Sequence, residues 1–400
     1  MARKKPIVID IFAGCGGLSL GLYKAGWKGF FAIEKDKMAF ETLRYNLISK
    51  KHHFSWPDWL PKTNHDIDEI ITKYERELKD LRGQIDLVAG GPPCQGFSMA
   101  GRRQENDKRN NLIHSYIKFV NYVKPKIILF ENVKGFTLGF NKNGKKGKAY
   151  SELVLEGLKK IGYLDIKGKL IDFSEFGVPQ KRKRYIIVGT QNGKTTLFFD
   201  KLFKTKDKFL ASIGINSNTN VFDAISDLHM ANGTNDCPDT NGFKSGMSGN
   251  PQNNYQRLLR KSINNNYIPD SHRFVNHRSN TVDIYKYLIE HAKRLQSIDE
   301  DLRDKLGIKK RDLAVLDRKK QSPTIMSIPD DYVHYCEPRV LTAREYARIQ
   351  SFPDWFEFKG KYTTGGKMRV HEVPRYTQIG NAIPPLFAEH TGKVLKELLD

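Results

Sequence analysis

The sequence predicts an α/β fold with a mostly parallel sheet, helices on both faces of the sheet and an irregular block inserted late in the chain. Two observations predict this fold. Short apolar runs alternate with amphipathic stretches of helical period over the first half of the chain. This alternation stops after about residue 190 and returns near residue 339. The length of 400 residues is enough for two or three domains.

The expected elements follow from these periods. Mainly apolar runs of strand length give the predicted strands, which are 7–12, 30–33, 85–89, 127–130 and 185–188. Apolar residues that recur every three or four positions give the predicted helices, which are 18–25, 66–81, 112–123, 154–161, 281–298, 342–350 and 385–399. Thr342 and Glu345 have the spacing of a capping box, which places a helix start between them.

The block from 195 to 335 differs in composition from the rest. Its segment 214–266 is rich in Asn, Gly and Ser, which suits loops and turns better than βα units. A flexible linker is the alternative, but Tyr255 and its apolar neighbours favour some folded elements. We therefore predict two domains, one made of 1–194 together with 336–400 and one made of 195–335.

The net charge of the chain indicates what kind of molecule it binds. Lys and Arg number 67 against 45 Asp and Glu, a formal net charge of +22. A charge of this size predicts a polyanionic partner, most often nucleic acid, although a solubilising surface charge is the alternative. No apolar run approaches the roughly 20 residues that a membrane span needs, and the first apolar run is interrupted by Asp10. Neither a membrane span nor a signal peptide is expected.

The four cysteines, Cys15, Cys94, Cys237 and Cys336, are far apart and form no CxxC pair. The sequence therefore predicts neither a disulfide framework nor a zinc site, and we expect no bound metal. Reduced thiols fit the cytosol, so a cytoplasmic location is expected.

A glycine-rich turn follows the first predicted strand. Gly14, Gly16 and Gly17 would let the backbone approach a ligand closely at the start of a helix. Glu34 lies 20 positions after Gly14, at the end of the next strand, where a carboxylate can accept from ribose hydroxyls. The pattern predicts a nucleoside cofactor, either a dinucleotide or S-adenosylmethionine. A tight turn with a surface Glu is the structural alternative.

Three further polar elements lie next to predicted strands. Cys94 stands in a Gly/Pro-rich loop, where a thiolate would be an exposed nucleophile rather than a packed side chain. Glu131 could protonate or hydrogen-bond a ring nitrogen, or only cap a loop. In a strand, Gln180, Arg182 and Arg184 share one face, which suits phosphate or base-edge contacts or a charged edge strand.

Taken together, these elements resemble the motifs of the DNA (cytosine-5)-methyltransferases, in the family's order. The motifs that carry the resemblance are 10–21, 34–36, 66–67, 90–98, 107–112, 131–133, 180–184, 339–353 and 378–385. They cover 7–190 and 335–390, and 195–335 matches none of them, as expected of a target-recognition region. One departure is His65, where the family usually has Gly before the Asp, which bears on the local backbone geometry.

The resemblance implies a Rossmann-like S-adenosylmethionine-dependent methyltransferase domain with a smaller, irregular target-recognition domain. It implies methyl transfer to C5 of a cytosine flipped out of a specific double-stranded DNA sequence, through a covalent adduct between Cys94 and C6. The product of the cofactor would be S-adenosylhomocysteine. The catalytic residues that the resemblance implies are Cys94, Glu131, Arg182 and Arg184.

The resemblance also implies the binding residues. Those expected to bind the cofactor are Phe12, Ala13, Gly14, Gly16, Gly17, Leu18, Glu34, Lys35, Asp66, Ile67, Gly90, Pro92, Asn381 and Ala382. Those expected to bind the substrate are Gln95, Ser98, Arg109, Asn132 and Gln180. The segment from Cys94 to about Arg109 mixes glycines and charges, and we expect it to close over the flipped base.

The expected partner is double-stranded DNA, bound by a monomer in the bacterial cytoplasm at the nucleoid. A cognate restriction endonuclease, acting separately, would suit such an enzyme. No long regulatory segment precedes the first motif, which favours a bacterial or phage modification enzyme. The main alternative is an RNA (tRNA) cytosine-5 methyltransferase of the same fold, which the long insert disfavours. A non-catalytic DNA-binding regulator and an NAD-dependent dehydrogenase would leave Cys94 and Glu131 without a role.

Overall fold

The computed structural model describes residues 5–93, 111–138, 141–142, 145–146, 149–261, 263, 267–366, 368 and 371–399. The chain divides into two compact units. Unit 1 consists of Met1–Phe173, Lys183–Lys206 and Phe387–Asp400, and unit 2 consists of Ser174–Arg182 and Asp207–Leu386. The predicted division into a catalytic and a target-recognition domain concerns function, and it stays a prediction.

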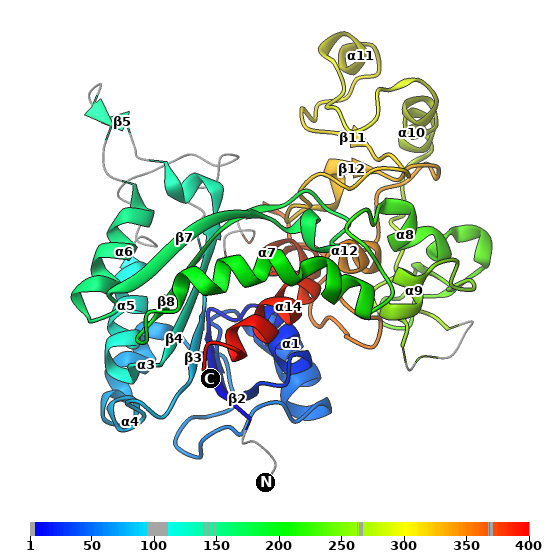
Figure 1. The fold of residues 1–400 in the computed structure, drawn as a ribbon. Helices are drawn as coiled ribbons and strands as arrows, with labels where there is room; N and C mark the ends of the chain where they lie inside the picture. Colours follow the sequence, from blue (N-terminus) through cyan, green and yellow to red (C-terminus); the bar gives the residue numbers. More distant parts are fainter. Residues whose placement is uncertain are drawn as a thin grey trace. The chain divides into compact units, whose positions relative to one another are not determined.

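Unit 1 is built on a six-stranded mixed sheet of order β2-β1-β3-β4-β8-β7 (Figure 1). Its strands are β1 (Ile7–Ile11), β2 (Lys28–Ile33), β3 (Leu87–Gly90), β4 (Ile127–Val133), β7 (Asp165–Asp172) and β8 (Lys183–Thr190). The first four are parallel, and β8 pairs antiparallel with both β4 and β7. The five predicted strands are confirmed. Strand β7 was not predicted, because its pattern IKGKLI interrupts the apolar residues with lysines and a glycine.

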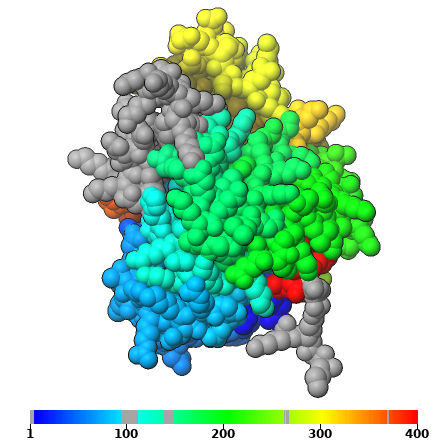
Figure 2. All heavy atoms as spheres, turned by 60° about the vertical axis from the view of Figure 1, so that its left-hand side comes forward, coloured from blue at the N-terminus to red at the C-terminus, as the bar shows by residue number. Residues whose placement is uncertain are grey.

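Helices cover both faces of this sheet. They are α1 (Gly17–Lys24), α2 (Lys37–Leu43), α3 (Ile67–Lys73), α4 (Glu75–Asp80), α5 (Asn111–Val123), α6 (Tyr150–Lys160), α7 (Thr195–Ser212) and α14 (Pro385–Lys396). Figure 1 shows α3, α5 and α6 on one side of the sheet and α1 and α14 on the other. Figure 2 turns the outer surface of the first layer, in blue and cyan, towards the viewer. The remaining regular pieces up to residue 190 are a π-helical segment (Arg44–Lys50), the 3-10 helices Lys134–Thr137 and Phe173–Phe176, and the short strands β5 (Asn141–Lys142) and β6 (Lys145–Lys146).

Three helix predictions differ from the structure. The helix expected over 66–81 is two helices, because the backbone leaves the helical region at Tyr74, where φ is −119° and ψ is 32°. The helix expected over 281–298 ends at His291. Helix α7 falls in the block that was expected to be irregular, although its buried Phe198, Leu202 and Phe209 recur at helical spacing.

Unit 2 is built from short elements. They are α8 (Val221–Ile225), α9 (Asn254–Leu259), α10 (Ser279–His291), α11 (Glu300–Lys305), α12 (Ala343–Ile349), α13 (Arg375–Asn381), β9 (Thr234–Asp236), β10 (Lys244–Gly246), β11 (Ala314–Val315) and β12 (Tyr332–Val333), with 3-10 helices at Ser226–Leu228, Met230–Asn232 and Pro329–Asp331. All residues of α12 are buried, so this helix forms the centre of the unit. The predicted capping box is confirmed, since Thr342 Oγ1 accepts from the N–H of Glu345 and the Glu345 carboxylate accepts from the N–H of Thr342.

Buried ion pairs fix α12 within unit 2. Arg348 contacts Asp354 at 2.5 Å and Asp227 at 3.1 Å, and Arg260 contacts Asp227 at 3.0 Å. Burial lowers the pKa of Arg348, but the two carboxylates more than offset this and hold it well above its ordinary value. Removing one partner of such a group leaves a buried charge uncompensated, which typically costs about 3–5 kcal/mol.

The C-terminal helix α14, which lies in unit 1 from Phe387 on, packs against α1. The indole N–H of Trp27 donates to the carbonyl of Gly392 at 2.8 Å, and Lys396 Nζ donates to the carbonyl of Ala25 at 3.1 Å. The two helices approach so closely at Gly21 that a Cβ built there would lie 2.6 Å from the backbone nitrogen of Glu389. The end of the chain therefore returns to the first motif in space.

This approach makes Gly21 a test of the packing in unit 1. We expect Gly21→Ala to lower the free energy of unfolding by about 1–3 kcal/mol, because the backbone of α14 has to move away. Urea unfolding followed by fluorescence measures the effect. Gly365→Ala is the matched control, because a Cβ there meets nothing within 4 Å. Equal midpoints for the two variants would contradict the close packing of α1 on α14.

Candidate active site

Several of the predicted functional residues that the structure describes in unit 1 lie along one edge of the sheet. The carboxyl ends of β1, β2, β3 and β4 meet there because these strands are parallel. From β1 the chain passes first to β2 on one side, and β3 then pairs on the other side, with Ile11 opposite Gly90. Doubly wound sheets bind ligands in the crevice where the strand order reverses in this way. Among the described residues, Glu34 directly follows β2 and Glu131 lies near the carboxyl end of β4, the positions that the sequence predicted for them; their roles in the site stay predictions.

The glycine loop after β1 has a backbone that favours glycine. Gly14 and Gly16 have φ values of +57° and +94°. A Cβ at Gly14 would meet nothing within 4 Å, so its surroundings are open. Gly16 is the N-cap of α1 and gives that helix no side-chain cap. Gly17 and Leu18 follow in the buried first turn of the helix.

Phe12 precedes the loop in an unusual conformation. Its φ is 59°, a left-handed value that is rare for a bulky side chain, and the residue is half-buried. The N–H of Ala13 donates to the carbonyl of Ile33 at 3.0 Å, which ties the loop to the end of β2. Such strain persists only where the surroundings enforce it, and it is frequent at ligand sites.

Glu34, at the end of β2, forms a hydrogen bond with the backbone of the glycine loop. Its carboxylate accepts from the N–H of Gly14 at 2.8 Å and from the N–H of Asp36 at 2.7 Å. Burial raises the pKa of Glu34 above its ordinary value, although both N–H groups favour the ionised form. Each carboxylate oxygen keeps acceptor capacity beyond these two bonds. The side chain can therefore hold the loop and still accept from a ligand's hydroxyls.

Asp66 caps α3 beside this edge. One of its oxygens accepts from the N–H of Asp68 at 2.9 Å, and the other contacts Lys35 Nζ at 2.7 Å. Burial opposes ionisation, but Lys35 and this N–H outweigh it and lower the pKa of Asp66. His65, the residue that departs from the family pattern, donates its N–H to the carbonyl of Glu34 at 2.8 Å without a left-handed backbone. The expected Gly is therefore not required there. Ile67 follows Asp66 and is buried.

Sequence reasoning missed Asp10 as a site residue. This carboxyl group is 1% exposed, and Oδ2 accepts from Ser19 Oγ at 2.5 Å. Its other oxygen, Oδ1, is buried without a hydrogen-bond partner. Burial raises the pKa of Asp10 to about 7. The signal was present in the sequence as a lone acid inside an otherwise apolar strand.

The backbone at the end of β3 and the start of the following loop packs closely against the backbones of β1 and β4. A Cβ at Gly90 would overlap the carbonyl oxygen of Ile11, and one at Gly91 would overlap that of Glu131. The side chain of Asn132 is buried and donates Nδ2 to the carbonyl of Pro92 at 3.4 Å. The predicted site residues that continue this loop lie outside the described residues; these are Cys94, Gln95, Ser98 and Arg109.

Two predicted catalytic residues form an ion pair at the end of β4. Arg184 Nε lies 2.9 Å from Glu131 Oε1, and the side chains are 14% and 16% exposed. The pair forms across the β4–β8 ladder, in which Arg184 stands opposite Val133. The arrangement presents a carboxyl group and a guanidinium group side by side at the sheet edge, which can bind the polar edge of a ring.

The chain belongs to the C-5 cytosine-specific DNA methylases. The family model matches residues 7–397, which is nearly the whole chain. The chain is therefore a DNA (cytosine-5)-methyltransferase of a family that uses S-adenosylmethionine, and the resemblance inferred from the motifs is confirmed. Membership of this family makes the dehydrogenase alternative wrong.

Relatives and solved structures agree with this family. The chain is 30% identical over 402 residues to the Type II methyltransferase M.DdeI of Desulfomicrobium norvegicum, covering 96% of this chain and 86% of that protein. It is 31% identical to M.PspPI of a Psychrobacter species, covering 98% and 79%. A crystal structure of a prophage-encoded DNA modification methyltransferase from E. coli, 24% identical, aligns with a TM-score of 0.66 over 99% of both chains. At this identity the last match shows the fold alone.

The residues of the methyltransferase fit its cofactor. The buried Oδ1 of Asp10 lacks a donor, which suits a ligand that carries cationic groups. The Glu34 carboxylate keeps acceptor capacity that suits ribose hydroxyls, and the space at Gly14 is open. The individual cofactor contacts stay predictions. Among the described helices of this methyltransferase, none is long and apolar enough to cross a membrane.

The remaining predicted site residues belong to unit 2. Gln180 and Arg182 are buried, and Arg182 Nη2 donates to the carbonyl of Gly380 at 2.6 Å. Gln180 Nε2 donates to Gln350 Oε1 at 2.8 Å, and Gln350 in turn donates to the carbonyl of Ala382 at 3.0 Å. Through its contact with Gly380, Arg182 holds the backbone at the end of α13. Asn381, the last residue of that helix, is exposed. A direct part for Arg182 or Gln180 in catalysis stays a prediction.

We expect Glu34→Ala to weaken binding of S-adenosylhomocysteine by about 10- to 100-fold, because the N–H groups of Gly14 and Asp36 lose their acceptor and the ligand loses its own. Isothermal titration calorimetry measures the dissociation constant. Glu34→Gln should lose less, since it keeps one carbonyl oxygen. Glu69→Ala, an exposed acid on α3, is the control. An unchanged dissociation constant for Glu34→Ala would exclude Glu34 from the cofactor site.

Proposed function

We propose that this methyltransferase acts on a cytosine within a specific sequence of double-stranded DNA, with Cys94 as the nucleophile. The observation that carries the proposal is the Glu131–Arg184 pair at the carboxyl end of β4, beside the backbone that leads to Cys94. Gly91 rests on the carbonyl of Glu131, and Cys94 follows it by three residues. The pair and the stem of the nucleophile loop therefore adjoin each other.

Cytosine C5 needs added electron density before it can react. In the proposed mechanism the Cys94 thiolate adds to C6, so that a carbon–sulfur bond forms and the electron pair of the C5–C6 double bond moves to C5 and is delocalised towards N3. Glu131 donates a proton or a short hydrogen bond to N3 and so stabilises the charge that develops there. Arg184, held beside Glu131, would contact O2.

S-adenosylmethionine, when bound, supplies the methyl group that C5 takes up. This chain's residues would hold it by the backbone of the glycine loop, with Phe12 against the adenosine, Glu34 at the ribose hydroxyls and Asp66 at the adenine amino group. Asp10 would face a cationic part of the ligand. A base then removes the C5 proton, the C5–C6 double bond re-forms, and Cys94 leaves as the thiolate.

The chemistry also requires the target base to leave the duplex. C6 is unreachable inside a stacked helix, so we propose that the cytosine is flipped out at a cost of a few kcal/mol. Contacts of the block 195–335 with the remaining duplex would offset that cost. A net charge of +22 supports binding to a polyanion, because counterion release favours it.

We further propose that this protein is a DNA modification enzyme that acts as a monomer in the bacterial cytoplasm. The curated relatives are named Type II methyltransferases, which supports a restriction-modification context and a separately acting endonuclease. Methylation of tRNA by the same fold is the alternative outcome of the assays below.

The nucleophile is tested by covalent trapping. Plasmid DNA that accepts tritiated methyl groups from S-adenosylmethionine is amplified with 5-fluoro-dCTP in place of dCTP. Fluorine at C5 cannot leave as a proton does, so the adduct should persist as a DNA-bound band on a denaturing gel. We expect trapping by the wild type and none by Cys94→Ser.

The control for trapping is Cys237→Ser, because Cys237 Sγ lies 3.1 Å from Asp239 Oδ1 and a hydroxyl can keep that bond. Cys237→Ser should trap as the wild type does. Methyl transfer by Cys94→Ser at the wild-type rate would refute the nucleophile. Transfer to tRNA but not to duplex DNA would refute the proposed substrate.

A further inference from the structure

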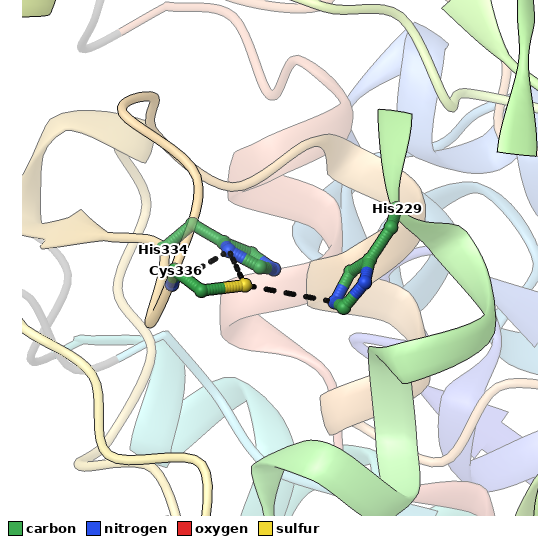
Figure 3. Close-up of side chains that lie close together, drawn as sticks. All are labelled: His229, His334 and Cys336. Atoms are coloured by element: carbon green, nitrogen blue, oxygen red, sulfur yellow. Dashed lines mark hydrogen bonds between the residues drawn. The ribbon is translucent and has the colours of Figure 1, made fainter. Parts of the chain in front are cut away.

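Three side chains of unit 2 that the proposed reaction does not use meet at one point. Cys336 Sγ lies 3.9 Å from His229 Nε2 and 3.8 Å from His334 Nδ1, and all three atoms lie within 4.8 Å of one another. Figure 3 shows the two rings and the thiol turned towards a common centre. Within the described ranges, this is the one group of three or more His, Cys, Asp or Glu side chains that lie this close together.

We propose that His229, His334 and Cys336 bind one divalent metal ion of the Zn²⁺ class. Two imidazole nitrogens and a thiolate form a typical donor set for tetrahedral zinc. Zn–S and Zn–N bonds of about 2.3 and 2.0–2.1 Å place sulfur and nitrogen about 3.5 Å apart in a tetrahedron. The observed separations of 3.8 and 3.9 Å therefore need only a small contraction. Cys336 is exposed, which leaves a fourth position for water.

The surroundings set the tautomer of His334 that metal binding needs. Its Nδ1 accepts from the N–H groups of Cys336 and Glu337 at 3.2 and 3.1 Å, so the ring proton is on Nε2. This Nε2 is buried without a hydrogen-bond partner and lies 3.8 Å from Glu345 Oε1. Metal-bound histidines usually direct their second nitrogen at a carboxylate. Glu345 is in turn fixed by Arg339 at 2.7 Å.

Metal entry exchanges hydrogen bonds for coordination bonds. His229 Nε2 lies 2.5 Å from the hydroxyl of Tyr335, and His334 Nδ1 accepts from the two backbone N–H groups. The ion would bind the His229 tautomer whose Nε2 carries the lone pair. The ion would take both lone pairs and displace the Cys336 thiol proton to solvent. The backbone donors lie at the long end of ordinary hydrogen-bond distances, so they hold His334 Nδ1 only weakly.

The site would tie two distant segments of unit 2 together. His229 and Cys336 are 107 residues apart in the chain. His229 follows the 3-10 helix Ser226–Leu228, whose Asp227 pairs with Arg348 of α12, and Cys336 lies seven residues before α12. A bound ion would therefore clamp the loop before α12 to the segment that α12 already holds by ion pairs. The sequence predicted no metal because the cysteines form no CxxC pair, a rule that does not cover ligands brought together by folding.

Metal binding is tested on untagged protein stripped by a chelator and then dialysed. Zn²⁺ is titrated against a chromophoric chelator, and Co²⁺ is titrated with absorption measured in the ultraviolet and visible ranges. We expect one equivalent of either ion per chain, with a thiolate-to-Co²⁺ charge-transfer band and tetrahedral visible bands. Zn²⁺ should also raise the thermal midpoint of the wild type.

Cys336→Ser and His229→Ala should each lower the affinity for Zn²⁺ by at least about 10- to 100-fold, and Cys336→Ser should remove the charge-transfer band. Cys237→Ser is the matched control and should keep both. Cys336 is exposed, so its Ser variant should fold, which the metal-free thermal midpoint verifies. Equal Zn²⁺ affinities of the wild type and Cys336→Ser would overturn the site, as would a band that survives in Cys336→Ser. None of these measurements depends on methyl transfer, so this proposal and the proposed function can fail separately.

Discussion

Close backbone packing at Gly90 and Gly91 fixes the arrangement of the candidate site at the sheet edge of unit 1. The backbone after β3 is there in contact with those of β1 and β4. Gly90 packs so closely against the carbonyl oxygen of Ile11 in β1 that a Cβ would not fit. Gly91 packs in the same way against the carbonyl oxygen of Glu131 in β4. Adjacent strands are about 4.8 Å apart, so the glycine loop, the stem of the nucleophile loop and Glu131 are set side by side. Any side chain at either glycine would push the strands' ends apart. Two residues without side chains thus bring the glycine loop, the start of the loop that leads to Cys94, and Glu131 to one place.

The pKa values of Asp10 and Glu34 in unit 1 and of Glu345 in unit 2 shift in opposite directions, although all three carboxyl groups are removed from solvent. In unit 1, burial raises the pKa of Asp10 to about 7 and also raises that of Glu34, and their protein partners are a hydroxyl and backbone N–H groups. In unit 2, burial acts in the same direction on Glu345, yet Arg339 beside it lowers the pKa to about 2. The difference is a guanidinium partner. Asp10 therefore keeps an acceptor oxygen for a ligand, whereas the Glu345 carboxylate is already satisfied by Arg339 and serves the fold.

The sequence predicted the parts of the fold that depend on local pattern. Strands β1, β3 and β4 are built on mainly apolar runs, and the Thr342–Glu345 capping box was readable from spacing alone. Strand β7 was missed because its lysines and glycine break the run. The cluster of His229 with His334 and Cys336 was out of reach, since only the folded chain brings together residues so far apart in sequence. Local pattern therefore predicts elements, and tertiary contacts decide which polar groups are left for ligands.

The motif Gln180-x-Arg182-x-Arg184 shows how one short pattern serves two purposes. In a strand these side chains would share one face, but β8 begins at Lys183, so only Arg184 lies in the strand. The first segment of unit 2 ends at Arg182, and unit 1 resumes at Lys183. Arg184 pairs with Glu131 in unit 1, whereas Arg182 donates to the carbonyl of Gly380 in unit 2. The segment that joins the units is therefore anchored by side chains in each of them, and the arginine proposed to contact cytosine is separated by one residue from the arginine that holds the end of α13.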